Sequence, residues 1–379
     1  MANNNKHTGP NVPALRFPEF SGEWENSRLG FIAEFSKGSG ISKDQRSETG
    51  NPCILYGELY TRYKSEVIKN VISKTDLPDT ELVKSKANDI IIPASGETAE
   101  DIATARCVPY DNILLGGDLN IIRLKNQDGR FFSYQLNGVR KYDIATVAQG
   151  VSVVHLHAGD LKGISVKYPL NMAEQRKIAE MISIIDDRIE TQSKIIEEQE
   201  TLLKSLADKL ISAQLANVAL CECVEAKAST MKESELDSSG EFPVYGASGL
   251  CGFCSDALEE SDSILITKDG SGVGTCQYAT EKHSFLGTLC SLTAKENVYL
   301  PYIYYALLNF NFASYKTGQA IPHIYFKDYG KATIYCPSYV EQIRIASGLQ
   351  KLDAKINADI ELLRQYRLQK EFLLSRMFI

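Results

Sequence analysis

The chain has 379 residues, of which 44% are hydrophobic and 23% are charged, and its formal net charge is −7. These values are typical of globular proteins with hydrophobic cores, and they exclude the collagen-like and intrinsically disordered classes. No apolar run approaches the ~20 residues that a membrane span requires, and the Asn-rich first residues contain no signal-peptide core, so we expect a cytoplasmic protein.

The cysteines do not form a recognisable pattern. There are nine, and this odd number argues against a disulfide framework. Cys251 and Cys254 have half the spacing of a structural zinc site, with Cys221 and Cys223 upstream, but the second two-residue gap of such a site is missing. We therefore expect no bound metal.

A first globular domain is expected over residues 1–170, with residues 1–14 flexible. Its apolar runs, such as 90–92 and 113–115, are short and separated by turn residues, which is typical of strands. Basic and acidic residues balance here, so this domain is not a basic patch by itself.

A long central helix is expected over residues 171–212, because apolar residues return at alternating steps of four and three, as in a coiled-coil seam. At a rise of 1.5 Å per residue, a helix of ~40 residues is about 60 Å long. The seam residues are Ile178, Ile182, Ile185, Ile189, Ile196, Leu203, Leu206 and Leu210.

A second globular domain is expected over residues 213–337, with strand-like runs at 263–266 and 332–335 and more acidic than basic residues. A second long helix follows over residues 338–379. Polar Gln192 and Asp359 interrupt the two seams at the same heptad position, which suggests that the helices pair with each other. The second seam consists of Ile345, Leu349, Leu352, Ile356, Leu363, Leu373 and Met377.

The segment before each long helix is repeated. Gly150, His155, Asp160 and Pro169 match, 168 residues later, Gly318, His323, Asp328 and Pro337. The pairs Glu174-Gln175 and Glu341-Gln342 open the two helices in the same way. Two copies indicate a pseudo-two-fold molecule rather than a solenoid.

We predict an α+β fold with two similar α/β domains, separated by two long helices that form an antiparallel coiled coil. The alternative is a helical hairpin inside an ordinary core, against which the matched polar interruptions count.

Together with Leu15-Arg16-Phe17-Pro18-Glu19-Phe20 ahead of Trp24, and with Gly318-Gln-Ala-Ile-Pro-His323-Ile324 leading to Pro337, these repeats resemble the specificity (S) subunit of a type I restriction-modification system. The resemblance covers nearly the whole chain. It implies two target-recognition domains, each reading one half of a split double-stranded DNA sequence, on helices that fix the spacing between the halves.

The resemblance also implies that this chain performs no chemistry. Its partners would be two methyltransferase subunits, which dock on the helices, and restriction/translocase subunits. S-adenosylmethionine, ATP and magnesium would be bound by those subunits, and no cofactor by this chain. The first copy has Val151-Ser-Val-Val-His155 where the second has Gln319 and Pro322, so a role of Gln319 or Pro322 is not carried to the first domain.

Polar side chains with fixed donor and acceptor patterns distinguish base edges in the major groove, so such residues on expected loops are candidate DNA contacts. A solvated surface role is the alternative for each, and a shared packing or turn role explains the repeated histidines equally well. The candidates are Tyr56, Glu58, Tyr60, Arg62, Ser95, Glu97 and His155 in the first domain, and Tyr245, Ser248, Lys268, Ser271, Lys316, Gln319 and His323 in the second.

The acidic balance of the chain argues against autonomous nucleic-acid binding. Basic surfaces of partner subunits could neutralise the phosphates, so that this chain would supply selectivity. The alternative function is a coiled-coil adaptor whose two heads bind proteins, which suits the acidic second domain. A stand-alone enzyme is disfavoured, because no catalytic residues converge at a recognisable spacing and no nucleotide-binding, zinc-protease or serine-hydrolase motif is present.

Overall fold

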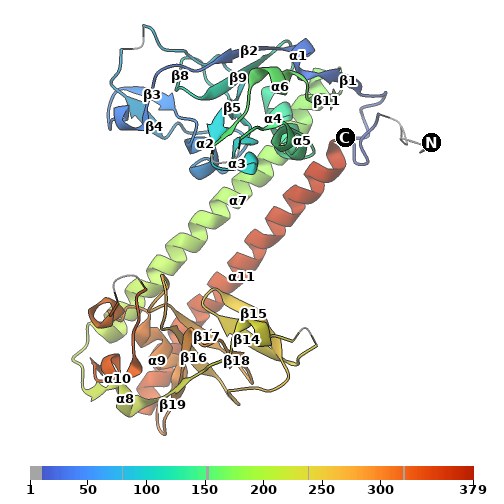
Figure 1. Ribbon diagram of the computed structural model, residues 1–379. Helices are drawn as coiled ribbons and strands as arrows, with labels where there is room; N and C mark the ends of the chain where they lie inside the picture. Colours follow the sequence, from blue (N-terminus) through green and yellow to red (C-terminus); the bar gives the residue numbers. More distant parts are fainter. Residues whose placement is uncertain (1–10, 79, 151–152, 238, 319–320) are drawn as a thin grey trace. The chain divides into compact units, whose positions relative to one another are not determined.

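The computed structural model describes residues 11–78, 80–150, 153–237, 239–318 and 321–379. The chain divides into two compact units. Unit 1 comprises residues 1–192 and 362–379, and unit 2 comprises residues 193–361. The long helices α7 (Met172–Ala207) and α11 (Tyr339–Met377) each contribute one segment to each unit (Figure 1). Among the helices of these described ranges, none combines the length and the apolar character of a membrane span.

Unit 1 contains one four-stranded antiparallel sheet and one three-stranded mixed sheet. In the larger sheet Ile90 and Ile92 face one core cluster and Ile91 faces another, so the apolar run predicted as a strand is buried on both sides. In the smaller sheet the central strand β3 is antiparallel to β4 and parallel to β8. In spatial order the strands are β2 (Ala33–Lys37), β9 (Leu119–Leu124), β5 (Asp89–Pro93) and β7 (Arg106–Val108), and then β4 (Ser73–Thr75), β3 (Asn51–Ile54) and β8 (Leu114–Leu115).

Short helices and strand pairs complete unit 1. Helix α4 (Gly129–Asn137) begins at Asp128, whose side chain accepts hydrogen bonds from the first free backbone N–H groups of the helix, and it lies beside α7 (Figure 1). The other elements are β1 (Glu25–Arg28), α1 (Leu29–Ile32), η1 (Lys43–Gln45), α2 (Glu58–Thr61), β6 (Ser95–Gly96), α3 (Ala99–Ile102), α5 (Lys141–Val147), β10 (Val154–His155), α6 (Ala158–Lys162) and β11 (Ser165–Tyr168).

Unit 2 repeats the topology of the two larger sheets. Its four-stranded sheet has the order β13 (Val224–Ala228), β19 (Leu289–Ala294), β16 (Ser263–Thr267) and β17 (Cys276–Ala279), and its three-stranded sheet has the order β15 (Gly249–Cys254), β14 (Phe242–Gly246) and β18 (Ser284–Phe285). The pair β14 and β18 is again parallel. The remaining elements are β12 (Val218–Ala219), α8 (Leu220–Cys223), η3 (Glu233–Glu235), α9 (Leu300–Leu307), η4 (Phe312–Tyr315), α10 (Phe326–Tyr329) and β20 (Thr333–Ile334). The sequence repeat is therefore a repeat of two complete α/β units.

A glutamine fixes the start of each long helix to its unit. The Gln175 side chain accepts a hydrogen bond from Asp128 N at 3.0 Å and donates one to Pro169 O at 2.7 Å. Gln342 makes the same two bonds, from Tyr299 N at 2.8 Å and to Pro337 O at 2.9 Å. These bonds satisfy backbone groups at the junction of helix and sheet, which explains why the glutamine is repeated.

The neighbouring glutamates differ. Glu174 is 1% exposed and accepts two hydrogen bonds of 2.8 Å from Arg16 and one of 3.2 Å from the indole of Trp24. Leu15 N also donates to Arg376 O, so the N-terminal segment ties α7 and α11 together in unit 1. Glu341 pairs with Arg344 at the surface, and the hydrogen bonds from Arg344 lower the pKa of the Glu341 carboxyl.

The two helices run antiparallel where they meet. In unit 1, Lys370 contacts Asp186 at 2.7 Å, and Arg188 lies over the ring of Tyr366, so residue numbers rise along α7 as they fall along α11. In unit 2, Gln199 donates to Asp359 at 3.0 Å. The expected polar interruptions Gln192 and Asp359 are 7% and 6% exposed, so both are buried.

Most of the expected seam residues lie at least half-buried along the two helices, and Leu210 is the exception at 41% exposure. The helix changes to a π-helical turn over Asp208–Ser212. Such a turn has i to i+5 hydrogen bonds and shifts the side-chain register by one residue. Ile211, at 2% exposure, consequently takes the buried position, so the assignment of Leu210 to the seam was wrong.

Arg16→Ala is expected to lower the free energy of unfolding of unit 1 by about 3 kcal/mol, because it leaves the buried Glu174 carboxylate without its cation. The chain has one tryptophan, Trp24, which bonds the same carboxylate, so its fluorescence during urea unfolding reports this site directly. Arg344→Ala, which removes only a surface partner of Glu341, should leave the Trp24 transition unchanged. Equal shifts for both variants would contradict this assignment.

Candidate nucleic-acid interface

Both units contain the same tight turn around their repeated histidine. His155 exchanges two backbone hydrogen bonds with Gln149, at 2.7 and 2.9 Å, and His323 exchanges two with Thr317, at 2.8 and 2.9 Å. The turn role proposed for the histidines is therefore carried by their backbone in both units.

A glycine is required in each of these turns. Gly150 and Gly318 have φ values of +129° and +86°, which side chains rarely adopt. A Cβ atom at Gly150 would lie 2.1 Å from Val153 O, and one at Gly318 would lie 2.4 Å from Ile321 O. The repeated glycines thus follow from backbone geometry.

The residue after each histidine donates a backbone hydrogen bond to the residue that follows a central strand of the four-stranded sheet. Leu156 N donates to Ala94 O, and Ile324 N donates to Lys268 O, both at 2.9 Å. Residues 94–95 and 268–269 therefore occupy equivalent positions at the ends of β5 and β16. One backbone frame presents two different sets of side chains.

In unit 2 this position holds a charged cluster. Asp269 accepts hydrogen bonds from Lys268 Nζ at 2.5 Å and from His323 Nδ1 at 2.7 Å. Burial alone would raise the pKa of the Asp269 carboxyl, but the hydrogen bonds from Lys268 and His323 lower it below its ordinary value. Asp269, which was not predicted from the sequence, thus brings together two residues that were.

In unit 1 the residue at the equivalent position is uncharged. Ser95 is 8% exposed, and its hydroxyl donates to Asp118 at 3.1 Å, while the His155 side chain is exposed. Serine here replaces the aspartate of unit 2, so the carboxylate that accepts from His323 in unit 2 has no counterpart at residue 95. The repeated histidines therefore have different surroundings.

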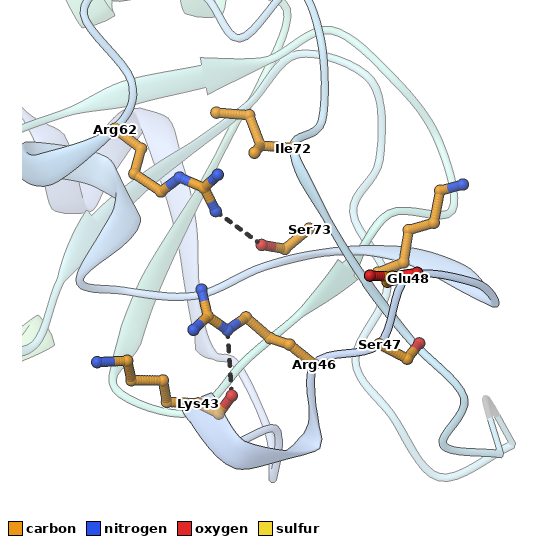
Figure 2. Close-up of a pocket in the computed structure, with 8 residues that line it drawn as sticks. Lys43, Arg46, Ser47, Glu48, Arg62, Ile72 and Ser73 are labelled. Carbon is orange, nitrogen blue, oxygen red and sulfur yellow. Dashed lines mark hydrogen bonds between the residues drawn. The ribbon is translucent and has the colours of Figure 1, made fainter.

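A basic pocket lies elsewhere on unit 1, between η1 and β4 (Figure 2). The basic pocket is the depression that is lined by Lys43, Arg46, Ser47, Glu48, Arg62, Ile72, Ser73 and Lys74. Four of these side chains are basic and one is acidic. Arg62 was predicted from the sequence as a contact residue, whereas Arg46, Lys43 and Lys74 were not. The signal that could have found two of them is the three-residue spacing of Lys43 and Arg46, which puts both on one face of a short helical turn.

Glu58 lies beneath the basic pocket and holds its arginines. Its Oε1 atom accepts a hydrogen bond from Arg62 Nη1 at 3.2 Å and from Ser73 Oγ, and Arg46 Nη1 is 3.7 Å away. Its Oε2 atom accepts from Leu55 N at 3.2 Å. Glu58 is only 4% exposed, so the expectation that it lies on an exposed loop was wrong: α2 turns it inward, where it orients Arg62.

The other predicted contact residues are not gathered into one site. Tyr56 and Tyr60 are half-buried near α2, and burial raises the pKa of Tyr60. Tyr245 is half-buried beside a core cluster, with its ring 5.8 Å from that of His283, so it contributes to packing. Gln319 lies outside the described residues. The exposed ones are Glu97, Ser248, Ser271 and Lys316.

In the part of the chain that the structure describes, no three His, Cys, Asp or Glu side chains are arranged to hold a metal ion. The two cysteines with zinc-like spacing donate to backbone carbonyl groups, Cys251 to Val244 O and Cys254 to Asp256 O. The first contact lies within the β14 and β15 hairpin, and the second lies just after β15.

Comparison with solved structures identifies the fold. The S subunit of a type I restriction-modification system from Mycoplasma genitalium superposes with a TM-score of 0.67 at 21% identity, over 97% of this chain and 99% of that chain. A chain from a study of complex assembly and conformational transition of the type I R-M system superposes with a TM-score of 0.54 at 15% identity, over 94% of this chain and 97% of that chain.

Sequence comparison gives the family. A predicted type I specificity subunit of Mycoplasma genitalium is 25% identical over 282 residues, which are 69% of this chain and 73% of that protein. Another from Mycoplasma pneumoniae is 25% identical over 254 residues, 57% of this chain and 67% of that protein. The type I restriction modification DNA specificity domain matches residues 21–201 and again residues 217–362. The chain therefore belongs to the type I restriction modification DNA specificity family, and its function is DNA recognition.

Proposed function

We propose that this chain reads a bipartite DNA target, with one half-site bound by each α/β head, and that the paired helices set the spacing between the half-sites. The heads correspond to residues 1–170 and 213–337, and the helical spacers to residues 171–212 and 338–379. The observation that carries this proposal is the repeated backbone frame with diverged side chains: Ser95 and Asp269 occupy equivalent positions in different chemical surroundings.

The side chains of the two heads differ as expected if each head reads a different DNA sequence. Base edges are distinguished by the pattern of donors and acceptors, so heads that read different sequences need different side chains on similar backbones. In unit 1 the basic pocket offers guanidinium donors. In unit 2 the position at the end of β16 presents Lys268 and His323, both of which donate hydrogen bonds to Asp269. Two different half-sites, joined by a constant spacer, are the expected target.

The catalytic work is assigned to partner subunits. We expect two methyltransferase subunits, which bind S-adenosylmethionine, and restriction/translocase subunits, which use ATP and magnesium, in the cytoplasm with the host DNA. The second structural relative was solved in a study of complex assembly of the type I R-M system, which supports an assembled state for this chain too. Because the chain has a net charge of −7, partner surfaces would supply most of the phosphate neutralisation.

Mapping methylated adenines in a methylation-free host that expresses this chain with its methyltransferase subunits tests the proposal. We expect one split motif with a constant spacer. Replacing residues 213–337 with the equivalent head of a relative should change one half of the motif and leave the other half intact, because each head has its own sheets and core. An unsplit motif, or a change in both halves, would contradict the assignment of one head to one half-site.

A second test addresses the helices. Inserting seven residues in both helices, after Gln192 and after Glu361, preserves the heptad seam and lengthens each helix by about 10 Å, at 1.5 Å per residue. We expect the spacer of the methylated motif to grow by about three base pairs, at 3.4 Å per base pair, with both half-sites unchanged. Insertions of the same length after Glu296, in the exposed turn between β19 and α9 that contains no candidate DNA contact, serve as the control and should leave the spacer as it was. A spacer of unchanged length after the helix insertions would exclude the ruler function.

The alternative function, a coiled-coil adaptor with two protein-binding heads, is tested by how DNA binding depends on salt and on this chain. DNA binding by the assembled complex should weaken steeply and linearly in a plot of log affinity against log salt, because phosphate contacts release counterions. An adaptor would give a complex whose DNA affinity does not depend on this chain.

A further inference from the structure

The basic pocket of unit 1 concentrates positive charge in a chain that is acidic overall. Lys43, Arg46, Arg62 and Lys74 line it, against the carboxylates of Glu48 at its rim and Glu58 beneath it. The nearby Asp76 carboxylate is engaged by the hydroxyl of Thr49. The pocket therefore carries a local surplus of cationic donors.

Unit 2 provides an internal comparison for the η1 and β4 side of this pocket, because it has the same backbone there, whereas α2 has no counterpart between β14 and β15. In η1 the turn is closed by Gln45 N donating to Ser42 O at 3.1 Å, and in η3 by Glu235 N donating to Lys232 O at 3.0 Å. In both units the glutamine or glutamate side chain also accepts from the backbone N–H that precedes the turn. Positions 43 and 46 of unit 1 are thus equivalent to positions 233 and 236 of unit 2.

The side chains at these equivalent positions are entirely different. Glu233 stands where unit 1 has Lys43, and Leu236 stands where it has Arg46. Leu236 packs against an apolar cluster and lies close to Gly252, where an added Cβ atom would be 3.1 Å from the leucine side chain. The registers of the two hairpins place Phe253 where unit 1 has Lys74.

The turn and hairpin that unit 2 shares with unit 1 therefore do not depend on a buried carboxylate. In unit 2 an apolar surface packs against the same turn and hairpin. Burying a carboxylate beside two guanidinium groups costs desolvation free energy, and an apolar cluster avoids that cost. Glu58 leaves Arg62 44% and Arg46 34% exposed beside the basic pocket, and this exposed pair of guanidinium groups indicates a binding role.

We propose that Arg62, with Arg46 beside it, reads a guanine in the half-site of the first head, and that Glu58 is the positioning residue that fixes the Arg62 guanidinium. This inference rests on the proposed function of DNA readout. Within the described residues, Glu58 and Ser73 engage only Nη1 of Arg62, at 3.2 and 3.4 Å. Its other N–H groups remain available as a fork that matches the O6 and N7 acceptors of guanine.

The flanking lysines complete the readout. Lys43 and Lys74 also line the basic pocket, where compact ammonium groups suit phosphate contacts that set the position of the duplex. Arg46 Nε donates to Lys43 O at 3.1 Å, which holds this arginine against the turn. The pocket thus combines one base-reading group with positioning charges.

The test uses the full chain assembled with its methyltransferase subunits, and measures equilibrium binding to duplexes in which each base pair of the first half-site is replaced in turn. Arg62→Lys keeps the charge but loses the fork. We expect discrimination at one G·C pair to fall by about 5- to 150-fold, with the salt dependence and the second half-site unchanged. The matched control is Lys64→Ala, an exposed cation outside the pocket, which should not alter discrimination at any base pair.

Other outcomes would overturn the inference. If Arg62→Ala weakens binding to every sequence equally while Arg62→Lys restores it, Arg62 is a phosphate contact. A first half-site without guanine on either strand, or unaltered discrimination in Arg62→Lys, would also contradict it. Glu58→Gln should relax selectivity at the same base pair and no other, and an unchanged Trp24 unfolding transition in that variant verifies that unit 1 remains folded.

These results remain separable from those that test the proposed function. If the wild-type complex methylates no split motif, the proposed function itself fails. If it methylates a split motif whose first half is read identically by the wild type and Arg62→Lys, only the guanine assignment fails.

Discussion

The two heads differ in many side chains, but both are attached to their long helix by the same hydrogen bonds. Gln175 and Gln342 bridge the end of a sheet to the first turn of a long helix with identical pairs of hydrogen bonds. Further along each helix, Tyr134 donates to Asp186 at 2.8 Å and Tyr305 donates to Asp353 at 3.2 Å. Because buried polar groups are costly when unpaired, these contacts tolerate little change in either unit.

Around these shared contacts, the two units have diverged. Unit 1 adds the buried ion pairs of Lys370 with Asp186 and Glu66, and the contact of Arg16 with Glu174. At the pocket it has buried charge where unit 2 has the apolar neighbours of Leu236. Both units share the backbone hydrogen bonds of the sheets and turns. The scaffold therefore fixes the position of a base-contacting residue but not the type of amino acid at that position.

The sequence predicted the parts of the fold that depend on local periodicity. The heptad seams located both long helices, and their matched polar interruptions indicated that the helices pair with each other. Leu210 was misplaced because a π-helical turn leaves no mark in an apolar repeat, and Glu58 because its burial results from β4 and η1, which are distant in sequence. Strands of two residues, such as β8 and β18, are defined only by their partners.

Of the candidate contacts, Arg62 and the pair Lys268 and His323 lie in polar clusters, whereas Tyr245 packs against a core.

The composition of unit 1 from two separate stretches of chain bears on the order in which the protein is made. Its core contains Leu373, Met377 and Phe378 from the far end of the sequence, packed with residues such as Phe131 and Ile178. Unit 2, by contrast, is continuous. During translation the second head can close while the first still lacks part of its interior, although the first emerges earlier from the ribosome. A premature stop codon near residue 362 would consequently damage the head at the opposite end of the gene and spare the one next to it.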